Sequence, residues 1–396
     1  MRINKQGAAW VLVVSLVGWL VGCGQPGARK ENRMIQWMKL ADLPGAEGTD
    51  SLGVSAPFAG VSEGVMIVAG GCNFPDKPVT EGGAKHYYGT VFALLPDGWQ
   101  AVGQLPEPVA YGAAVTMPSG VVCVGGNNSD SSLTRVSRIR LDSKSGKAVV
   151  EPLPALPLPM DNLAAAAIGE RVYVAGGNEG GKPCHSLLRL NLAQPERGWE
   201  RLADFPGAAR VQPVLTAAEG KVYLAGGFQP IEGEKRPEVP TEVLVFDPDS
   251  DSWSRETELP TFADGAKRTL TGGCAVTYRT DKLLFFGGVN YDIFWAAIAR
   301  PLHIAQAEAA NDTTALARLR ADAKAYMHHP AAWYRFNTTL LQYDLSTRAW
   351  SELGDYEQLA RAGAAALLRD NRLTVINGEL KPGIRTPLVN QAVIGE

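Results

Sequence analysis

The stretch NLAAAAIGERVYVAGG (162–177) contains the pattern that organises this chain. A strand of small residues leads through a tight turn into a second, apolar strand that ends in two glycines. The same phrase recurs as SAPFAGVSEGVMIVAGG (55–71), GAAVTMPSGVVCVGG (112–126), QPVLTAAEGKVYLAGG (212–227), GGCAVTYRTDKLLFFGG (272–288) and GAAAALLRDNRLTVING (363–378). In the last copy, Asn377 replaces the first glycine. Repetition of one supersecondary unit predicts a repeat architecture.

A third, alternating strand follows most glycine pairs, and then a tryptophan, as at Trp199, Trp253 and Trp350. Each unit therefore predicts four short strands in roughly 50 residues, which resembles the kelch repeat of β-propellers. The second unit departs from the pattern because its last strand, near 147–153, has no tryptophan. We expect an all-β fold in which residues 36–396 form a six-bladed kelch-type β-propeller.

The two ends of this region predict how the ring closes. The last unit stops at its third strand, LVNQAVIGE (388–396), whereas Gln36-Trp37-Met38 already looks like a fourth strand. We expect the N-terminal strand to complete the C-terminal blade, because closure removes open sheet edges. The fifth unit carries an insertion, residues 290–336. Its Ala-rich segment 305–327 has helical spacing, and the insertion can serve as a lid, a wall of the site, or a packing or dimer element.

In an antiparallel meander, the loops after the glycine pairs and the loops that enter each first strand share one face. The first group contributes Asn73, Phe74, Asn127, Asn178, Phe228, Asn290 and Glu379. The second group contributes Asp50, Tyr111, Asp161, Asn162, Arg210, Lys267, Arg268 and Arg361. Most of these residues are expected to be ordinary surface loop.

The N-terminal residues predict a targeting signal and not a folded segment. Two cations, Arg2 and Lys5, precede an apolar run at 8–21 that is too short to favour a spanning helix. The run ends in Leu-Val-Gly-Cys at Cys23, which resembles the bacterial lipoprotein signal. We expect residues 1–22 to be a signal peptide, Cys23 to be lipidated and 23–35 to be a tether; ordinary signal cleavage is the alternative. The protein would then lie in the periplasm or at the cell surface, on the outer membrane if the host has two membranes.

Composition excludes several classes of function. The net charge of −3 leaves no basic excess for a nucleic-acid partner. The glycine pairs end strands and open no helix, so they are not phosphate cradles. Cysteine and histidine show no zinc spacing, and we expect no metal or cofactor. Four cysteines, Cys72, Cys123, Cys184 and Cys274, are expected to be mostly small buried apolar residues.

The segment VINGELKPGIRTPLV (375–389) stands out, because the broken glycine pair is followed by Glu379, Lys381 and Arg385. By its chemistry alone it can be a salt-bridged surface loop or a site for an acidic, polyhydroxylated ligand. The segment resembles the N-G-E-x-K-P-G-[LI]-R-T motif of bacterial N-acetylneuraminate epimerases (sialic acid mutarotases). Three further stretches, 287–299, 336–350 and the FAG…AGG…F run at 58–74, also look like that family.

The resemblance implies a six-bladed kelch propeller in which Glu379 accepts a proton and Arg385 lies near the substrate. The motif blade is last here and mid-chain in the typical family member, so the sequence looks circularly permuted. The implied activity is interconversion of the α and β anomers of N-acetylneuraminate, with a homodimer as a possible assembly. By position on the site face only, Arg210, Arg361, Asn73, Asn290 and Lys381 are further candidates for substrate binding. The alternatives are a non-catalytic kelch module that binds glycans or proteins, and the same chemistry on another keto acid or aldose.

Overall fold

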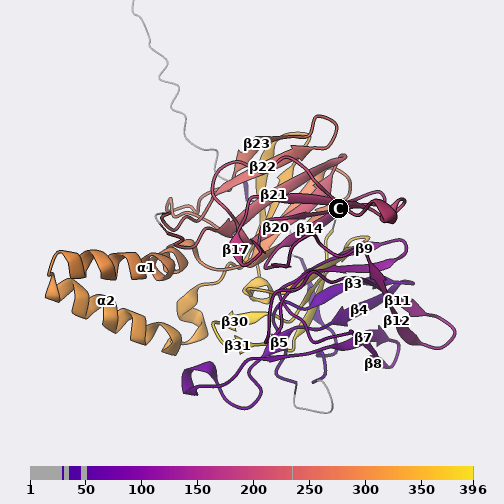
Figure 1. Cartoon of the computed structure of the whole chain (residues 1–396), viewed down its shortest axis with the longest axis horizontal. Coiled ribbons are helices and arrows are strands. Elements are labelled where there is room, and N and C mark those ends of the chain that lie inside the picture. Colours follow the sequence, from indigo (N-terminus) through magenta and orange to yellow (C-terminus); the bar gives the residue numbers. More distant parts are fainter. Residues whose placement is uncertain (1–28, 31–34, 46–50, 234, 396) are drawn as a thin grey trace, which may run out of the picture.

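The computed structural model describes residues 29–30, 35–45, 51–233 and 235–395. The signal segment 1–22, Cys23, most of the tether and the loop candidate Asp50 lie outside the described residues. Within the described ranges, no helix is long and apolar enough to cross a membrane. The described residues form mostly antiparallel sheets with two α-helices, so the all-β expectation is confirmed (Figure 1).

The first half of the chain forms three sheets of four strands. Sheet 1 consists of β3 (Phe58–Ser62), β4 (Val65–Ala69), β7 (Thr90–Leu95) and β8 (Gly98–Gln104). Sheet 2 consists of β9 (Ala113–Met117), β10 (Gly120–Val124), β11 (Val136–Asp142) and β12 (Lys147–Leu153). Sheet 3 consists of β14 (Ala164–Ile168), β15 (Arg171–Ala175), β18 (Leu187–Asn191) and β19 (Trp199–Arg201).

The second half repeats this arrangement. Sheet 4 consists of β20 (Val211–Ala218), β21 (Lys221–Phe228), β22 (Glu242–Asp247) and β23 (Ser252–Glu258). Sheet 5 consists of β24 (Gly273–Tyr278), β25 (Lys282–Gly287), β26 (Thr339–Asp344), β27 (Ala349–Asp355) and the short parallel strand β1 (Arg29–Lys30). Sheet 6 consists of β28 (Ala365–Arg369), β29 (Arg372–Ile376), β32 (Val389–Val393) and β2 (Trp37–Lys39).

Chain segments from opposite ends meet in sheet 6. Strand β2 pairs antiparallel with β32, with Trp37 opposite Ala392 and Lys39 opposite Asn390. The outermost strand of this sheet therefore comes from the N-terminal side of the chain, where the sequence pattern places it. Part of the expected tether also pairs, because Arg29 lies opposite Ser351 of β27.

The first strands of the six sheets pack against one another in cyclic order: β3 on β9, β9 on β14, β14 on β20, β20 on β24, β24 on β28, and β28 on β3. Before or at the start of these strands, one residue of each sheet donates its N–H to the carbonyl of its counterpart in the preceding sheet. We call these residues the axial ring: Ala56, Tyr111, Asn162, Gln212, Gly272 and Gly363. The N···O distances lie between 2.7 and 3.1 Å, and the bond from Ala56 to Gly363 returns to the start. All members have φ between 52° and 66°.

The glycine pairs sit where the backbones of neighbouring sheets approach most closely. A Cβ on Gly176 would lie 2.6 Å from the carbonyl oxygen of Arg210 in the next sheet. The second glycine, Gly177, donates its N–H to that same carbonyl at 2.7 Å. Both glycines have positive φ, which side chains rarely tolerate. The recurring pair is thus required by contact between sheets.

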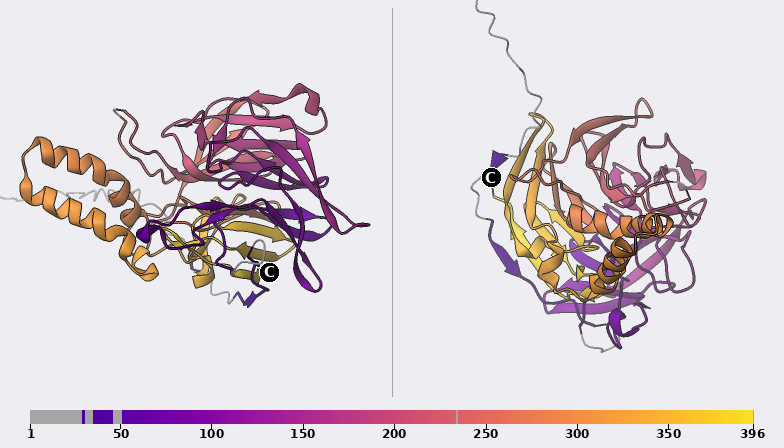
Figure 2. Two further views of the ribbon diagram at one scale, coloured as in Figure 1. Left: turned by 60° about the horizontal axis from the view of Figure 1, so that its bottom comes forward. Right: turned by 90° about the vertical axis from the view of Figure 1, so that its left-hand side faces the viewer.

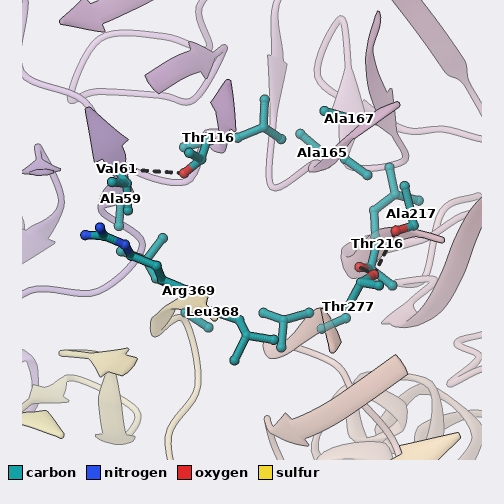
Figure 3. A pocket seen from close by; sticks show the side chains of 18 of the residues that line it. Ala59, Val61, Thr116, Ala165, Ala167, Thr216, Ala217, Thr277, Leu368 and Arg369 are labelled. Atoms are coloured by element: carbon teal, nitrogen blue, oxygen red, sulfur yellow. Dashed lines mark hydrogen bonds between the residues drawn. The ribbon is translucent and has the colours of Figure 1, made fainter. Parts of the chain in front are cut away.

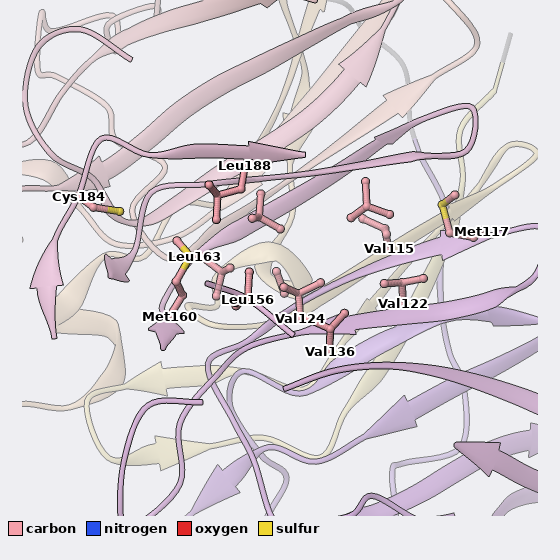
Figure 4. Packing of buried hydrophobic residues seen from close by; sticks show 13 residues of the cluster. Val115, Met117, Val122, Val124, Val136, Leu156, Met160, Leu163, Cys184 and Leu188 are labelled. Atoms are coloured by element: carbon pink, nitrogen blue, oxygen red, sulfur yellow. The ribbon is translucent and has the colours of Figure 1, made fainter. Parts of the chain in front are cut away.

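Between neighbouring sheets lies a separate apolar core. Figure 4 shows the one between sheets 2 and 3, where Val122 and Val136 meet Leu188 and its neighbours, and where Cys184 is buried. Corresponding cores fill the other junctions, including the junction of sheet 6 with sheet 1, where Ile376 and Val389 pack with Val68. Cys72, Cys123, Cys184 and Cys274 are all buried free thiols, as expected.

The repeated tryptophans hydrogen-bond sheets 3, 4 and 5 to the sheet that precedes each of them. The indole N–H groups of Trp199, Trp253 and Trp350 donate to Pro154 O, Ala203 O and Thr257 Oγ1, at 2.8, 2.8 and 3.3 Å. Each acceptor lies close to the end of the last strand of the preceding sheet. An indole can fill apolar space and still donate one hydrogen bond, which explains its recurrence at this position.

The insertion of sheet 5 is a helical hairpin that projects from the body (Figures 1 and 2). It consists of α1 (Tyr291–Ala309), α2 (Thr313–Ala325) and the short turns η4 (Tyr326–His328) and η5 (Ala331–Tyr334). Helicity was expected over 305–327, but it starts earlier and is interrupted at 310–312. Asn290 caps α1 by accepting from Ile293 N at 3.1 Å, and the helix runs through Pro301.

Replacement of Gly177 by alanine tests the close approach of backbones at the glycine pair. The new Cβ would lie 2.3 Å from Asp161 O, in addition to the strain of φ +81°. We expect Gly177→Ala to cost more than the about 1–2 kcal/mol of left-handed strain alone. The control is Gly180→Ala, where φ is +58° but nothing lies within 4 Å. Urea denaturation should rank Gly177→Ala well below Gly180→Ala; equal losses would contradict the role of close approach.

Candidate active site

Glu379 and Arg385 face each other across a small hairpin that follows the sixth repeat. Strands β30 (Glu379–Lys381) and β31 (Ile384–Arg385) pair antiparallel, with Glu379 directly opposite Arg385. The turn contains Gly383 at φ 84°, a value that favours glycine. Register alone brings the two charged side chains together, and Arg385 Nη2 lies 2.6 Å from Glu379 Oε1. The structure thus joins the two residues that the sequence motif singled out.

The guanidinium of Arg385 is almost fully enclosed, and its side chain is only 3% exposed. Its Nε donates to Ser55 Oγ at 3.3 Å, and its Cζ lies 4.8 Å from the ring centroid of Phe74. Its Nη1 is buried without a hydrogen-bond acceptor among the described residues. A buried cationic donor left unpaired is costly, so this nitrogen is suited to an anionic ligand.

Glu379 is the more accessible partner, with 23% of its side chain exposed. Burial raises the pKa of its carboxyl above the ordinary value, while the charges of Arg385 and Lys85 partly offset the effect. A carboxyl whose pKa is raised in this way is a better proton acceptor than an ordinary glutamate, and it can return the proton later in a reaction.

Two residues from other sheets complete the surroundings of this pair. Lys85, from the loop between β5 (Cys72–Asn73) and β6 (His86–Tyr87), donates from Nζ to Tyr111 Oη at 3.3 Å. The same nitrogen lies 4.8 Å from the Tyr111 ring centroid. Tyr111 is the axial-ring residue of sheet 2. Sequence reasoning placed Tyr111 on the site face without singling it out, and gave no signal for Lys85.

A cavity of about 280 Å³ adjoins the hairpin, and it is lined by Arg385, Gly383, Asn73, Phe74 and neighbouring residues of the β5–β6 loop. Its size is near that of small-molecule sites. A larger cavity, of about 570 Å³, occupies the axis at the opposite ends of the first strands (Figure 3). Its lining is mostly alanine and threonine, and Arg369 is its charged residue. The larger cavity therefore lacks the acid–base groups that the hairpin has.

The helical insertion approaches the hairpin from the side. Figure 1 places β30 and β31 beside β5, on the side of the body from which α1 and α2 project. Lys381 Nζ donates at 2.7 Å to the carbonyl oxygen of His329, the residue directly after η4. Burial, followed by the charges of Tyr334 and Glu379, raises the pKa of Tyr326 to about 12, and Arg300 opposes this. The base of the insertion is thus a wall near Glu379.

The other sequence candidates have structural partners. Asn73 donates to Gly53 O and accepts from Tyr88 Oη, both at 2.8 Å, and lines the cavity beside Arg385. Asn290 caps α1, and Lys381 holds the insertion. These contacts give the three side chains roles in shaping the site.

Arg210 and Arg361 are turned into the sheets instead of toward a ligand. Arg210 is 0% exposed and pairs with Glu242 while it donates to Gly226 O. Arg361 donates to the carbonyls of Asn377 and Leu388 at 3.2 and 2.9 Å. This geometry favours a structural role for both, because charged groups at the corners between sheets satisfy buried carbonyls. Face position alone does not distinguish them from Arg385.

Among the described residues, no three His, Cys, Asp or Glu side chains come close enough to hold a metal ion. The arrangement of the hairpin instead offers a proton acceptor of raised pKa beside a rigid cation with a free donor. Such a pair can bind an acid and move a proton on an atom next to its carboxylate.

Comparison with known proteins agrees with this reading. The family model for N-acetylneuraminate epimerase matches residues 26–148 and 153–396. An N-acetylneuraminate epimerase of Haemophilus influenzae (strain PittEE) is 34% identical over 60% of this chain and 58% of its own length. One of Pasteurella multocida (strain Pm70) is 31% identical over 61% of this chain and 59% of its own length. A solved structure, described as the structure of YjhT, has 29% identity and a TM-score of 0.49, covering 59% of this chain and 62% of that one.

Each of these alignments spans less than two thirds of the relative that it matches. The family model, in contrast, covers nearly all of the chain from residue 26 onward, and it includes both the hairpin and the helical insertion. On this match the chain belongs to the N-acetylneuraminate epimerase family.

Proposed function

We propose that this protein is a sialic acid mutarotase, which interconverts the α and β anomers of N-acetylneuraminate at the Glu379–Arg385 pair. The observation that carries the proposal is the in-register pairing of a partly exposed carboxyl with a buried guanidinium that keeps one donor free. The curated relatives in this family are named for the epimerase.

The chemistry needs few groups. N-acetylneuraminate is a 2-keto acid closed as a pyranose, so changing its anomer requires ring opening at C2, rotation and reclosure. Arg385 binds the C1 carboxylate through Nη1 and so places the anomeric hydroxyl beside Glu379. Glu379 accepts the hydroxyl proton as the ring opens and returns it on reclosure. Mutarotation proceeds unaided, so the about 10²–10⁴-fold typical of general acid–base catalysis is sufficient.

We also propose that the six sheets are the blades of a closed kelch propeller. The cyclic ring of backbone hydrogen bonds, the six cores between sheets and the pairing of β2 with β32 support it.

We further propose that the chain is circularly permuted relative to the typical family member. An alignment that keeps the residue order can match only one of the two exchanged parts of permuted chains. This agrees with the two epimerase alignments, each of which covers about 60% of this chain and 58–59% of the relative.

A non-catalytic module remains the second candidate, together with a mutarotase for another sugar. A binder has no need of a proton acceptor beside the ligand's own negative charge, and the raised pKa of Glu379 favours the enzyme. A thermal-shift panel of sugars separates these readings, because a ligand that binds only the folded state raises the melting temperature. The homodimer remains a prediction from the sequence.

Replacement of Glu379 by glutamine tests the proton acceptor. The amide keeps the shape but cannot accept the proton, so we expect the catalysed rate to fall by about 10²–10⁴-fold. The measurement follows the anomer signals by NMR after a sialidase releases the α anomer. Glu242→Gln is a matched control, since Glu242 is 25% exposed and pairs with the buried Arg210 as Glu379 pairs with Arg385. An active, folded Glu379→Gln protein would remove Glu379 from the mechanism.

The pH dependence of the wild-type enzyme provides a separate test. Only ionised Glu379 accepts a proton, and burial raises its pKa. The catalysed rate should therefore rise with pH on the acid side, with a midpoint above the ordinary glutamate value of about 4.3. The spontaneous rate is measured at each pH and subtracted. A midpoint at or below the ordinary value would contradict this environment for Glu379.

We propose, from the sequence alone, that Cys23 anchors the protein by a lipid to a bacterial membrane. Cys23→Ser should abolish incorporation of labelled fatty acid and release the protein into the soluble fraction. The measurement is fractionation of cells that express either form. Wild-type protein that carries no label would contradict the anchor and favour ordinary signal cleavage.

A further inference from the structure

Tyr111 is an unusual residue at its position. It belongs to the axial ring, where the backbone of each sheet turns into its first strand with φ near +60°. Glycine occupies this position in sheets 5 and 6, and alanine in sheet 1. A bulky aromatic residue is strained at φ 60°, because the left-handed conformation brings its Cβ close to a carbonyl oxygen. Strain of this kind is retained where the side chain has a use, and it is a reason to ask what Tyr111 does.

The phenol of Tyr111 connects the components of the site. It accepts a hydrogen bond from Lys85 Nζ at 3.3 Å on one side, and on the other it interacts with the hydroxyl of Ser55. Ser55 in turn accepts from Arg385 Nε at 3.3 Å. Alongside burial, the charge of Glu379 raises the pKa of Tyr111, and the charge of Lys85 in turn opposes the burial that raises the pKa of Glu379. Three loops of different sheets thus bring a phenol, an ammonium, a guanidinium and a carboxyl into one network.

The proposed reaction leaves one chemical requirement unmet by Glu379 and Arg385. When the pyranose opens, the ring oxygen leaves C2 and must gain a proton, and on reclosure it must lose one. Glu379 is occupied with the anomeric hydroxyl. Arg385 stays protonated at accessible pH and is a poor proton donor. A second acid–base group is needed within the same network.

Resting on the proposed mutarotase function, we propose that Tyr111 is this second catalytic group and that Lys85 is its positioning residue. In ring opening, the bond between C2 and the ring oxygen breaks and C2 becomes a ketone. The anomeric hydroxyl proton goes to Glu379, and the Tyr111 phenol proton goes to the ring oxygen. In reclosure on the other face, the sugar hydroxyl returns its proton to Tyr111 and Glu379 protonates the ketone oxygen, so no proton is gained or lost.

The surroundings of the phenol fit both halves of this cycle. Burial, followed by the effects of Cys72 and Glu379, raises the pKa of Tyr111, so the phenol holds its proton before ring opening. The phenolate that forms lies next to the Lys85 ammonium, which stabilises it by charge at hydrogen-bond distance. Lys85 therefore supports the reaction through Tyr111, in addition to its electrostatic effect on Glu379.

The test compares Tyr111→Phe with Tyr87→Phe, a neighbouring tyrosine whose ring centroid lies 5.9 Å from Lys85 Nζ. NMR anomer exchange gives kcat and KM, and thermal shift with N-acetylneuraminate reports binding. For Tyr111→Phe we expect kcat to fall by about 10²-fold or more, while KM and the thermal shift stay near wild type. Tyr87→Phe should retain wild-type kcat. A Tyr111→Phe protein that keeps its kcat overturns the assignment, as does a loss confined to KM.

Three further variants separate catalysis from structure. Tyr111→Gly relieves the left-handed strain but removes both the ring and the phenol, so it should be inactive, and urea denaturation shows whether the protein is still folded. Lys85→Met should lower kcat and Lys85→Arg should restore part of it, because a cation again faces the phenol. Full activity in Lys85→Met removes the positioning role. Wild-type protein without anomer exchange would defeat the proposed function itself, whereas active wild type with active Tyr111→Phe defeats only this inference.

Discussion

The closed ring of backbone hydrogen bonds at the axis is the constraint on which the rest of the structure depends. Six N–H groups, one from each sheet, donate to six carbonyls in a cycle, and the bond of Ala56 to Gly363 joins the first sheet to the last. Such a cycle fixes the six first strands at one radius. At this radius the backbones of neighbouring sheets lie very close together. The second strands therefore end in glycine, and the residues that line the axis are largely alanine.

The same constraint makes a site available. Loops that leave the second strands and loops that enter the first strands emerge together around the ring, so residues far apart in sequence share one mouth. Glu379 and Arg385 come from the sixth repeat, Lys85 from the first and Tyr111 from the second. None of these loops needs a core of its own, because the apolar packing lies between the sheets. The chemistry can therefore differ in each loop while the scaffold stays repetitive.

Sequence reasoning succeeded where a residue's role repeats and was incomplete where it does not. Gly176 and Gly177 recur because most junctions bring backbones this close, and Trp199 recurs because several outer strands are hydrogen-bonded to the preceding sheet in this way. Glu379 was found through its motif. Lys85 carries no such signal, since its importance comes from a loop of sheet 1 folding over Tyr111 of sheet 2, a contact between residues 26 apart that no local pattern encodes.

Arg210 and Arg361 illustrate a different limit of sequence patterns. Both precede an axial-ring residue by two positions, on the face where the site lies, yet their guanidinium groups point back to main-chain carbonyls. Arg385 lies after the turn of a two-strand hairpin, where the register directs its side chain to Glu379 instead. The chemical type of these arginines is identical, and only the direction of the backbone at each position differs. Among the terminal nitrogens of these three arginines, only Nη1 of Arg385 lacks an acceptor in the described part of the chain, which supports Arg385 as the proposed anion-binding residue.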